Sequence, residues 1–204
     1  RPPRSTPLYS SAASDVYKRQ QLNLALTGSL IIEEMGQFYN RLVWLEAGIS
    51  SPKIYDKKHL FSLANEHKHY RPGTQKLILE YKSWKIALFI CYDLRFPVWS
   101  RNVEGVDLMI YVANWPNKRS LAWKSLLPAR AIENQCYVAG VNRIGMDANQ
   151  IFYSGDSAVY DFEGRQIMDL GSQDAIQTIE LSQHELQVYK RAYPFLKDAD
   201  KFHI

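Results

Sequence analysis

Cys91 stands at the end of an apolar run, where a thiol could act as a nucleophile. Five of the six residues from 86 to 91 are aliphatic or aromatic and none is charged, which is typical of a strand buried on both faces. Polarity changes at Tyr92 and Asp93, and Pro97 stands where a helix could begin. At such a strand-to-helix turn, backbone N–H groups can lower the pKa of a thiol and hold an oxyanion. The alternative is a small buried hydrophobic residue, and the local pattern does not separate the two.

A thiol nucleophile also needs a proton acceptor and a group that stabilises an oxyanion. Five histidines could accept the proton: His59, His67, His69, His184 and His203. None of them follows an apolar run in the manner of Cys91. Lys57 is more informative, because Tyr55 and Phe61 could draw its ammonium inward, towards a thiolate or a developing oxyanion. A solvated loop lysine is the alternative.

Composition favours one packed domain and excludes several classes of protein. The 204 residues are 46% hydrophobic, which suffices for one sizeable core. No stretch of about 18 uncharged apolar residues occurs, so we predict no membrane partner. Two cysteines in apolar surroundings cannot form a disulfide framework and fit a reducing cytoplasm. Residues 1–20 carry four basic residues and one acidic residue, and so contribute most of the net charge of +4. The rest is nearly neutral, which argues against a nucleic-acid partner.

The first twenty residues differ in character from the rest of the chain. They hold three prolines, no apolar periodicity and no hydrophobic core of a signal peptide. We therefore predict that residues 1–20 are a disordered or foreign leader, and that the domain comprises residues 21–204.

From residue 22 onwards the pattern predicts alternating strands and helices. Strands are expected at 22–33, 38–47, 77–81, 85–91, 107–113, 136–142, 157–162 and 175–181. Helices are expected at 96–102, at 120–135 with a possible kink at Pro128, and from Ser182 to about residue 191. This mixture predicts a layered α/β domain in which helices cover a sheet.

Several segments in a fixed order resemble the nitrilase superfamily of carbon–nitrogen hydrolases. Residues 55–61 (YDKKHLF) and 91–97 (CYDLRFP) are similar to its lysine and cysteine signatures, and residues 113–116 (ANWP) and 129–135 (ARAIENQ) to later blocks. Residues 99–102 and 140–145 most resemble its bacterial omega-amidase branch, which hydrolyses 2-oxoglutaramate. The resemblance covers residues 22–204.

The resemblance implies an α/β fold, the four-layer αββα sandwich of this superfamily, which assembles into homodimers or higher homo-oligomers. It implies that Cys91 is the nucleophile and that Lys57 binds the tetrahedral intermediate. The backbone N–H of Tyr92 would complete the oxyanion hole, and Glu66 would orient the lysine. The alternative for Glu66 is a surface carboxylate. No metal or organic cofactor is implied.

A substrate that carries a carboxylate calls for a cation in the pocket. Three arginines are candidates: Arg95, Arg119 and Arg143. Arg95 could equally be an ion-pair partner of Asp93 or Glu133, and the sequence does not choose among the three. Asn114 and Trp115, in the ANWP block, are expected at the pocket. Trp123 is more typical of the core, and Cys136 of a buried strand.

One residue of the family's catalytic set has no counterpart. The resemblance places the first glutamate, the general base, in a Leu-Pro-Glu-like stretch well before the segment that matches residue 22, and residues 1–22 hold no such stretch. Glu33, Glu34 and Glu46 match non-catalytic positions. We therefore expect residues 21–204 to be a carbon–nitrogen hydrolase domain without its N-terminal strand, helix and first glutamate, and the chain alone to be nearly inactive.

The resemblance predicts a cytoplasmic amidase that hydrolyses the omega-amide of a small 2-oxo dicarboxylate monoamide through a cysteine thioester. A different amide or carbamoyl hydrolase of the superfamily is the first alternative. A catalytically dead fragment acting in binding or assembly is the second. A metal site formed by His59, His67 and His69 is a third, less favoured than a solvated histidine-rich loop.

Overall fold

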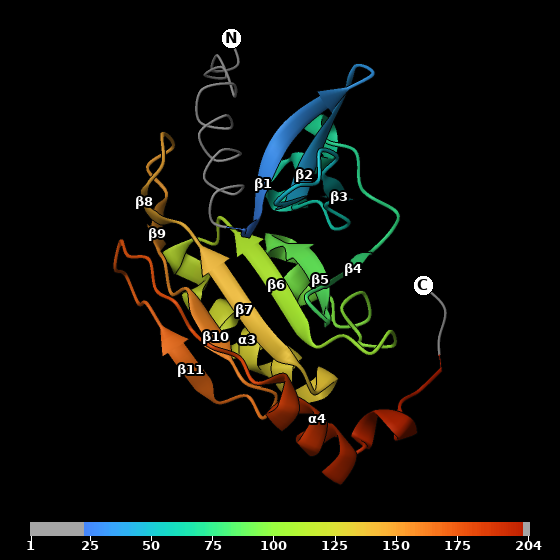
Figure 1. The fold of residues 1–204 in the computed structure, drawn as a ribbon. Coiled ribbons are helices and arrows are strands. Elements are labelled where there is room, and N and C mark those ends of the chain that lie inside the picture. The colour runs from blue at the N-terminus through green and yellow to red at the C-terminus, as the bar shows by residue number, and fades with distance from the viewer. Residues whose placement is uncertain (1–22, 202–204) are drawn as a thin grey trace.

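The structure is a computed structural model that describes residues 23–201 (Figure 1). The chain begins with a three-stranded antiparallel sheet in the order β1 (Ala25–Glu34), β2 (Gln37–Glu46), β3 (Lys53–Asp56). Met35 and Gly36 form the two-residue turn between β1 and β2, and both have positive φ, which matches the twist of a hairpin. The strands predicted at 22–33 and 38–47 correspond to the two strands of this hairpin.

A six-stranded mixed sheet follows, in the order β11-β10-β7-β6-β5-β4. Its strands are β4 (Leu77–Tyr81), β5 (Trp84–Ile90), β6 (Leu108–Ala113), β7 (Tyr137–Asn142), β10 (Ala158–Tyr160) and β11 (Gln166–Asp169). β5, β6 and β7 are parallel, and the outer strands pair antiparallel to them. A short hairpin of β8 (Ile144–Met146) and β9 (Phe152–Ser154) follows β7. The parallel strands are the near-continuous apolar runs of the sequence, because both of their faces are covered.

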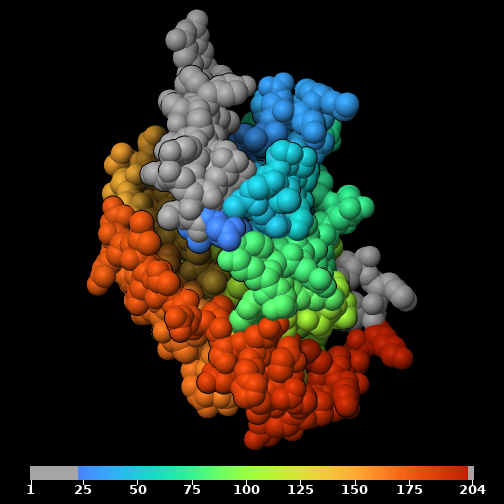
Figure 2. All heavy atoms as spheres, viewed as in Figure 1, coloured from blue at the N-terminus to red at the C-terminus, as the bar shows by residue number. Residues whose placement is uncertain are grey.

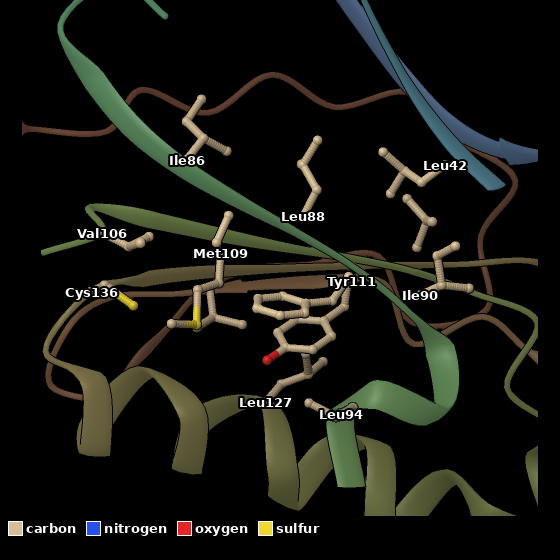
Figure 3. Packing of buried hydrophobic residues seen from close by; sticks show 14 of the residues in the cluster. Leu42, Ile86, Leu88, Ile90, Leu94, Val106, Met109, Tyr111, Leu127 and Cys136 are labelled. Carbon is tan, nitrogen blue, oxygen red and sulfur yellow. The ribbon is translucent and has the colours of Figure 1, made fainter. Parts of the chain in front are cut away.

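The core lies on both sides of this sheet (Figure 3). Leu127 of α3 (Ser120–Asn134) lies on one side of β5, and Leu42 of β2 lies on the other. Gly140 of β7 lets the helix approach closely, because a Cβ there would stand 2.5 Å from a methyl carbon of Leu127. A helix layer, a six-stranded sheet and a second sheet therefore stack, as a layered α/β domain requires.

The C-terminal part of the described chain ends in α4 (Gln183–Ala192). The Ser182 hydroxyl accepts the backbone N–H of Glu185 and so caps the helix that the sequence predicts to begin there. Leu186 of α4 packs with Tyr137 and Phe162 in a second, smaller core. In Figure 2 this helix, in red, and the β1–β2 hairpin, in blue, lie at opposite ends of the molecule.

Two predicted elements are absent from the described residues. Residues 96–102 form turns instead of a helix, because the 3₁₀ helix η2 (Cys91–Arg95) already follows β5 directly. Residues 175–181 have β-forming composition but pair with no strand, and Ile176 is fully exposed. Pro128 does not divide α3, which runs as one helix.

Short helical turns complete the described chain: η1 (Ser62–Ala64), α2 (Glu66–His69), η3 (Asn117–Arg119) and η4 (Phe195–Asp198). Within residues 23–201 no helix has the length and apolar character needed to cross a bilayer. The predicted leader, residues 1–20, lies outside the described residues.

Candidate active site

A cavity of about 250 Å³ lies where β5 and β6 end, at the carboxyl edge of the six-stranded sheet. In Figure 1 the arrowheads of β6 and β7 point to this edge. The structure brings all the predicted site residues except Arg143 to its wall: Lys57, Glu66, Cys91, Tyr92, Arg95, Asn114, Trp115 and Arg119. The sequence separates these residues widely, and the parallel strands gather them at one edge.

Cys91 begins η2 with a left-handed backbone, φ 46°. This conformation is unfavourable for a residue with a side chain, so the surroundings must hold it. Its sulfur lies 3.9 Å from the carbonyl oxygen of Asn114. Burial raises the pKa of the Cys91 thiol to about 11; Lys57 opposes this rise, and Glu66 adds to it. The resting group is therefore a thiol, and attack requires a base to remove its proton.

Lys57 is a buried cation with one carboxylate partner. Its side chain is 2% exposed, so the solvated alternative is wrong. Its Nζ lies 3.0 and 2.7 Å from the two carboxylate oxygens of Glu66. The backbone N–H of Phe61 donates to the same carboxylate at 2.8 Å, which fixes Glu66 in turn. The ammonium is thus held at the cavity wall by an ion pair, as an electrostatic stabiliser of an oxyanion must be.

The backbone of Tyr92 lies next to the nucleophile candidate. Tyr92 is in the first turn of η2, where helical N–H groups have no acceptor within the helix. Its ring packs edge-on against Phe61 and Phe96, with centroids 4.9 and 5.0 Å away. The aromatic contacts fix the turn, and the residue lines the cavity.

Two of the three candidate arginines reach the cavity wall. The Arg95 guanidinium lies 5.1 Å from the Trp115 ring, and that of Arg119 lies 4.9 Å from the Phe61 ring. Within residues 23–201 neither belongs to an ion pair. Arg143 does not line the cavity; its guanidinium lies 4.7 Å from the ring of Tyr153, which does.

The ion-pair alternative for Arg95 is not observed. Asp93 lies against the ring of His59, and Glu133 pairs with Arg130. The stacked guanidinium of Arg95 therefore has hydrogen-bonding capacity left for a ligand in the cavity.

Within residues 23–201, Cys136 and the histidines do not line the cavity, and His203 lies outside the described residues. Cys136 is fully buried, and burial raises the pKa of its thiol to about 12. Trp123 is also fully buried, and its indole N–H donates to the carbonyl of Asp156. In the described part of the chain no three histidine, cysteine or acidic side chains gather as metal ligands would.

The glutamates set aside from catalysis have other partners. Glu34 pairs with Arg41, and Glu46 pairs with Lys53. Among residues 23–201, Glu66 is the carboxylate that lines the cavity, and it is engaged with Lys57.

The sequence matches the carbon–nitrogen hydrolase family over residues 16–191, most of its length. The chain belongs to the carbon–nitrogen hydrolase family. Among curated carbon–nitrogen hydrolases it is similar to Omega-amidase YafV of Escherichia coli K12, at 46% identity over 92% of this chain and 73% of that protein. It is also similar to 2-oxoglutaramate amidase of Bacillus subtilis, at 34% identity over 86% of this chain and 68% of that protein.

Solved structures give the same assignment. The chain superimposes on XC1258 from Xanthomonas campestris, a CN-hydrolase superfamily protein with an arsenic adduct in its active site, with a TM-score of 0.91. Identity is 42%, over 95% of this chain and 76% of that one. Nit3 of Saccharomyces cerevisiae, in the nitrilase superfamily, gives a TM-score of 0.80 at 22% identity, over 95% of this chain and 72% of that one. The predicted nitrilase-type fold is therefore confirmed.

Two polar residues near the cavity were not predicted from the sequence as site residues. Asn142, the last residue of β7, binds both backbone groups of Trp115: its Oδ1 accepts the N–H at 2.7 Å, and its Nδ2 donates to the carbonyl at 3.0 Å. Asp93 is fully buried beside Cys91 and accepts several hydrogen bonds. Both follow or end a buried strand at the carboxyl edge, and that position is the signal that could have identified them.

Proposed function

We propose that this protein is an amidase that hydrolyses the omega-amide of a 2-oxo dicarboxylate monoamide, such as 2-oxoglutaramate, to the acid and ammonia. One observation carries the proposal: one cavity is lined by a thiol, a buried lysine paired with a carboxylate, and two arginines that have no ion-pair partner among residues 23–201. The similarity to the Escherichia coli and Bacillus subtilis amidases supports the same substrate class.

In the proposed reaction the Cys91 thiolate attacks the amide carbonyl and forms a tetrahedral intermediate. The Lys57 ammonium and the Tyr92 N–H stabilise the oxyanion. They therefore act on negative charge that develops only as the tetrahedral intermediate forms. Collapse breaks the C–N bond, and a protonated general acid supplies the proton with which ammonia leaves. Water then attacks the thioester, and the carboxylic acid leaves as the thiol is regenerated.

Arg95 and Arg119 would hold the carboxylate of the substrate. Guanidinium groups bind carboxylates through two parallel hydrogen bonds, and both arginines are fixed over aromatic rings at the cavity wall. An amide without that carboxylate would leave them unpaired in a confined site, which favours the dicarboxylate monoamide.

Proton transfer would be the task of a further carboxylate. Glu66 is engaged with Lys57, and the Cys91 thiol is protonated at neutral pH. The family's first glutamate is the general base that the resemblance supplies. We propose that the hydrolase domain works with that glutamate, and that the leader predicted over residues 1–20 is foreign to it before residue 16, where the family match begins.

We further propose that the protein acts in the cytoplasm as a homodimer. Two free cysteines without a disulfide support a reducing compartment. Light scattering would test the dimer, since a mass equal to one chain would contradict it.

A substrate panel tests the function. Ammonia release would be measured with 2-oxoglutaramate, a simple aliphatic amide and a carbamoyl compound, using the 204-residue chain and a longer form with the family's upstream segment. The proposal predicts a kcat/KM for 2-oxoglutaramate at least about tenfold above the others. Preference for the carbamoyl compound would favour a different hydrolase of the family. Absence of turnover in both forms would favour a role in binding or assembly.

A further inference from the structure

The carboxylate of Asp93 is fully buried and uses both of its oxygens. Oδ2 accepts the hydroxyl of Tyr55 at 2.7 Å and the backbone N–H of Ile90 at 3.0 Å. Oδ1 accepts the backbone N–H of His59 at 3.0 Å and lies 2.8 Å from the Nδ1 atom of the same residue. A carboxylate without these donors would be unstable at this depth, so the network forms as a unit.

These partners flank the two reactive side chains. Tyr55 and His59 stand two residues before and two residues after Lys57, and Ile90 and Asp93 stand on either side of Cys91. Two segments that are far apart in the sequence are therefore joined at one carboxylate. The joint includes no atom of Lys57 or Cys91, but it connects the backbone that carries each of them.

The Tyr55 hydroxyl extends this hydrogen-bond network around the Asp93 carboxylate. Besides donating to Asp93, it accepts the N–H of Lys58 at 3.2 Å and the indole N–H of Trp99 at 3.1 Å. Tyr55 is 1% exposed, and Lys58 directly follows the active-site lysine. The chain is thus held two residues before Lys57, at Tyr55, and directly after it, at Lys58.

The Cys91 turn depends on the same carboxylate. Cys91 adopts φ 46°, and the bond from the Ile90 N–H to Asp93 closes the turn around it. A left-handed backbone at a residue other than glycine persists only where its surroundings impose it.

We propose that Asp93 is a positioning residue that holds Lys57 against Cys91, so that the lysine can act on the thiol and on the oxyanion. This role rests on the proposed function and adds to it the residue that sets the separation of the Lys57 and Cys91 side chains. Lys57 is tied to Glu66 for its direction, while Asp93 fixes the distance between the two segments.

A merely structural Asp93 is the competing interpretation. Its replacement would then destabilise the fold without changing what Lys57 does to Cys91. A double-mutant cycle separates the two cases, because it measures whether the effect of one substitution depends on the other.

The measurement is the pH dependence of Cys91 alkylation by iodoacetamide, followed by peptide mass spectrometry on the 204-residue chain. Lys57→Met removes the cation that favours the thiolate, and should slow alkylation about tenfold at a fixed pH below the pKa of the thiol. With Asp93→Asn, which keeps the shape but cannot accept at both positions, the same substitution should change the rate less than about threefold.

Asp107→Asn is the matched control. Asp107 is also a buried carboxylate of this sheet, 6% exposed, and it accepts the Lys85 N–H and pairs with Lys190 away from the cavity. In this background Lys57→Met should keep its full effect. An undiminished effect in the Asp93→Asn background as well would overturn the proposal.

Tyr55→Phe keeps the test decisive if Asp93→Asn does not fold. It removes one hydroxyl from the hydrogen-bond network of Asp93 and retains the ring. In this background, the effect of Lys57→Met on the alkylation rate should lie between its values in the unsubstituted chain and in the Asp93→Asn protein. An effect equal to that in the unsubstituted chain would contradict the inference. Alkylation needs no turnover, so the cycle is readable even where the proposed amidase activity fails.

Discussion

The two cysteines lie at opposite edges of the same parallel strands. Cys91 directly follows β5, at the carboxyl edge, whereas Cys136 directly precedes β7, at the amino edge. Cys91 opens onto a cavity with a lysine and two arginines in its wall. Cys136 is fully buried in the core on the α3 side of the sheet, where Figure 3 shows it beside Met109.

Thiol acidity does not separate these two sites. Burial raises the pKa of both thiols, to about 11 for Cys91 and about 12 for Cys136, and a lysine opposes the rise in each case. What differs is access for a substrate and the presence of groups that act on developing charge. We therefore expect the position at the sheet edge to determine thiol reactivity more than the resting pKa does.

Removing each cysteine gives the largest expected contrast. In the longer form with the upstream glutamate, Cys91→Ala should lower ammonia release at least about 10³-fold, because the thioester cannot form. Cys136→Ala should lower the melting temperature and leave kcat nearly unchanged. A coupled ammonia assay and a thermal melt measure both. Loss of turnover in the Cys136→Ala protein with its fold intact would refute the contrast.

Adding the upstream glutamate tests whether the cavity at the carboxyl edge lacks a general base of its own. The 204-residue chain should turn over 2-oxoglutaramate about 10²–10⁴-fold more slowly than the longer form, because no carboxylate besides Glu66 lines the cavity within residues 23–201. The kcat values of both forms measure this difference. Equal turnover would mean that a carboxylate of this chain, such as Glu34 or Glu46, serves as the base.

Replacing the arginines should weaken substrate binding at the same edge. Arg95→Met or Arg119→Met should raise KM about ten- to a hundredfold, since each change removes a charge-assisted hydrogen bond. Arg143→Met is the control, because Arg143 does not line the cavity itself and contacts it only through the ring of Tyr153. If Arg143→Met alone raised KM, the arginine assignment would have to be reversed.

The sequence predicted most of this architecture for a physical reason. The strands at 84–90, 108–113 and 137–142 are rich in apolar residues on both faces, which is typical of strands covered on both sides in a sheet. The local pattern singled out Cys91 and Lys57, the family resemblance gave each a role, and the structure places both at one cavity.

The errors have physical causes as well. The helix expected at residues 96–102 rested on Pro97, but the side chain of Asp93 binds the Ile90 N–H and starts a helical turn at Cys91. The strand expected at 175–181 rested on composition, and composition cannot show whether a partner strand is available. The β8–β9 hairpin has strands of three residues, too short for a periodic pattern.

Alkylation of the native 204-residue chain across pH tests the central claim, that the carboxyl edge makes Cys91 the reactive thiol. The raised pKa means that less thiolate exists at any given pH below about 11, so the rate at Cys91 should rise about tenfold per pH unit up to that value. Peptide mass spectrometry should find iodoacetamide on Cys91, slowed by 2-oxoglutaramate, and on Cys136 only after denaturation. Labelling of Cys136 before Cys91 in the folded protein would contradict the account.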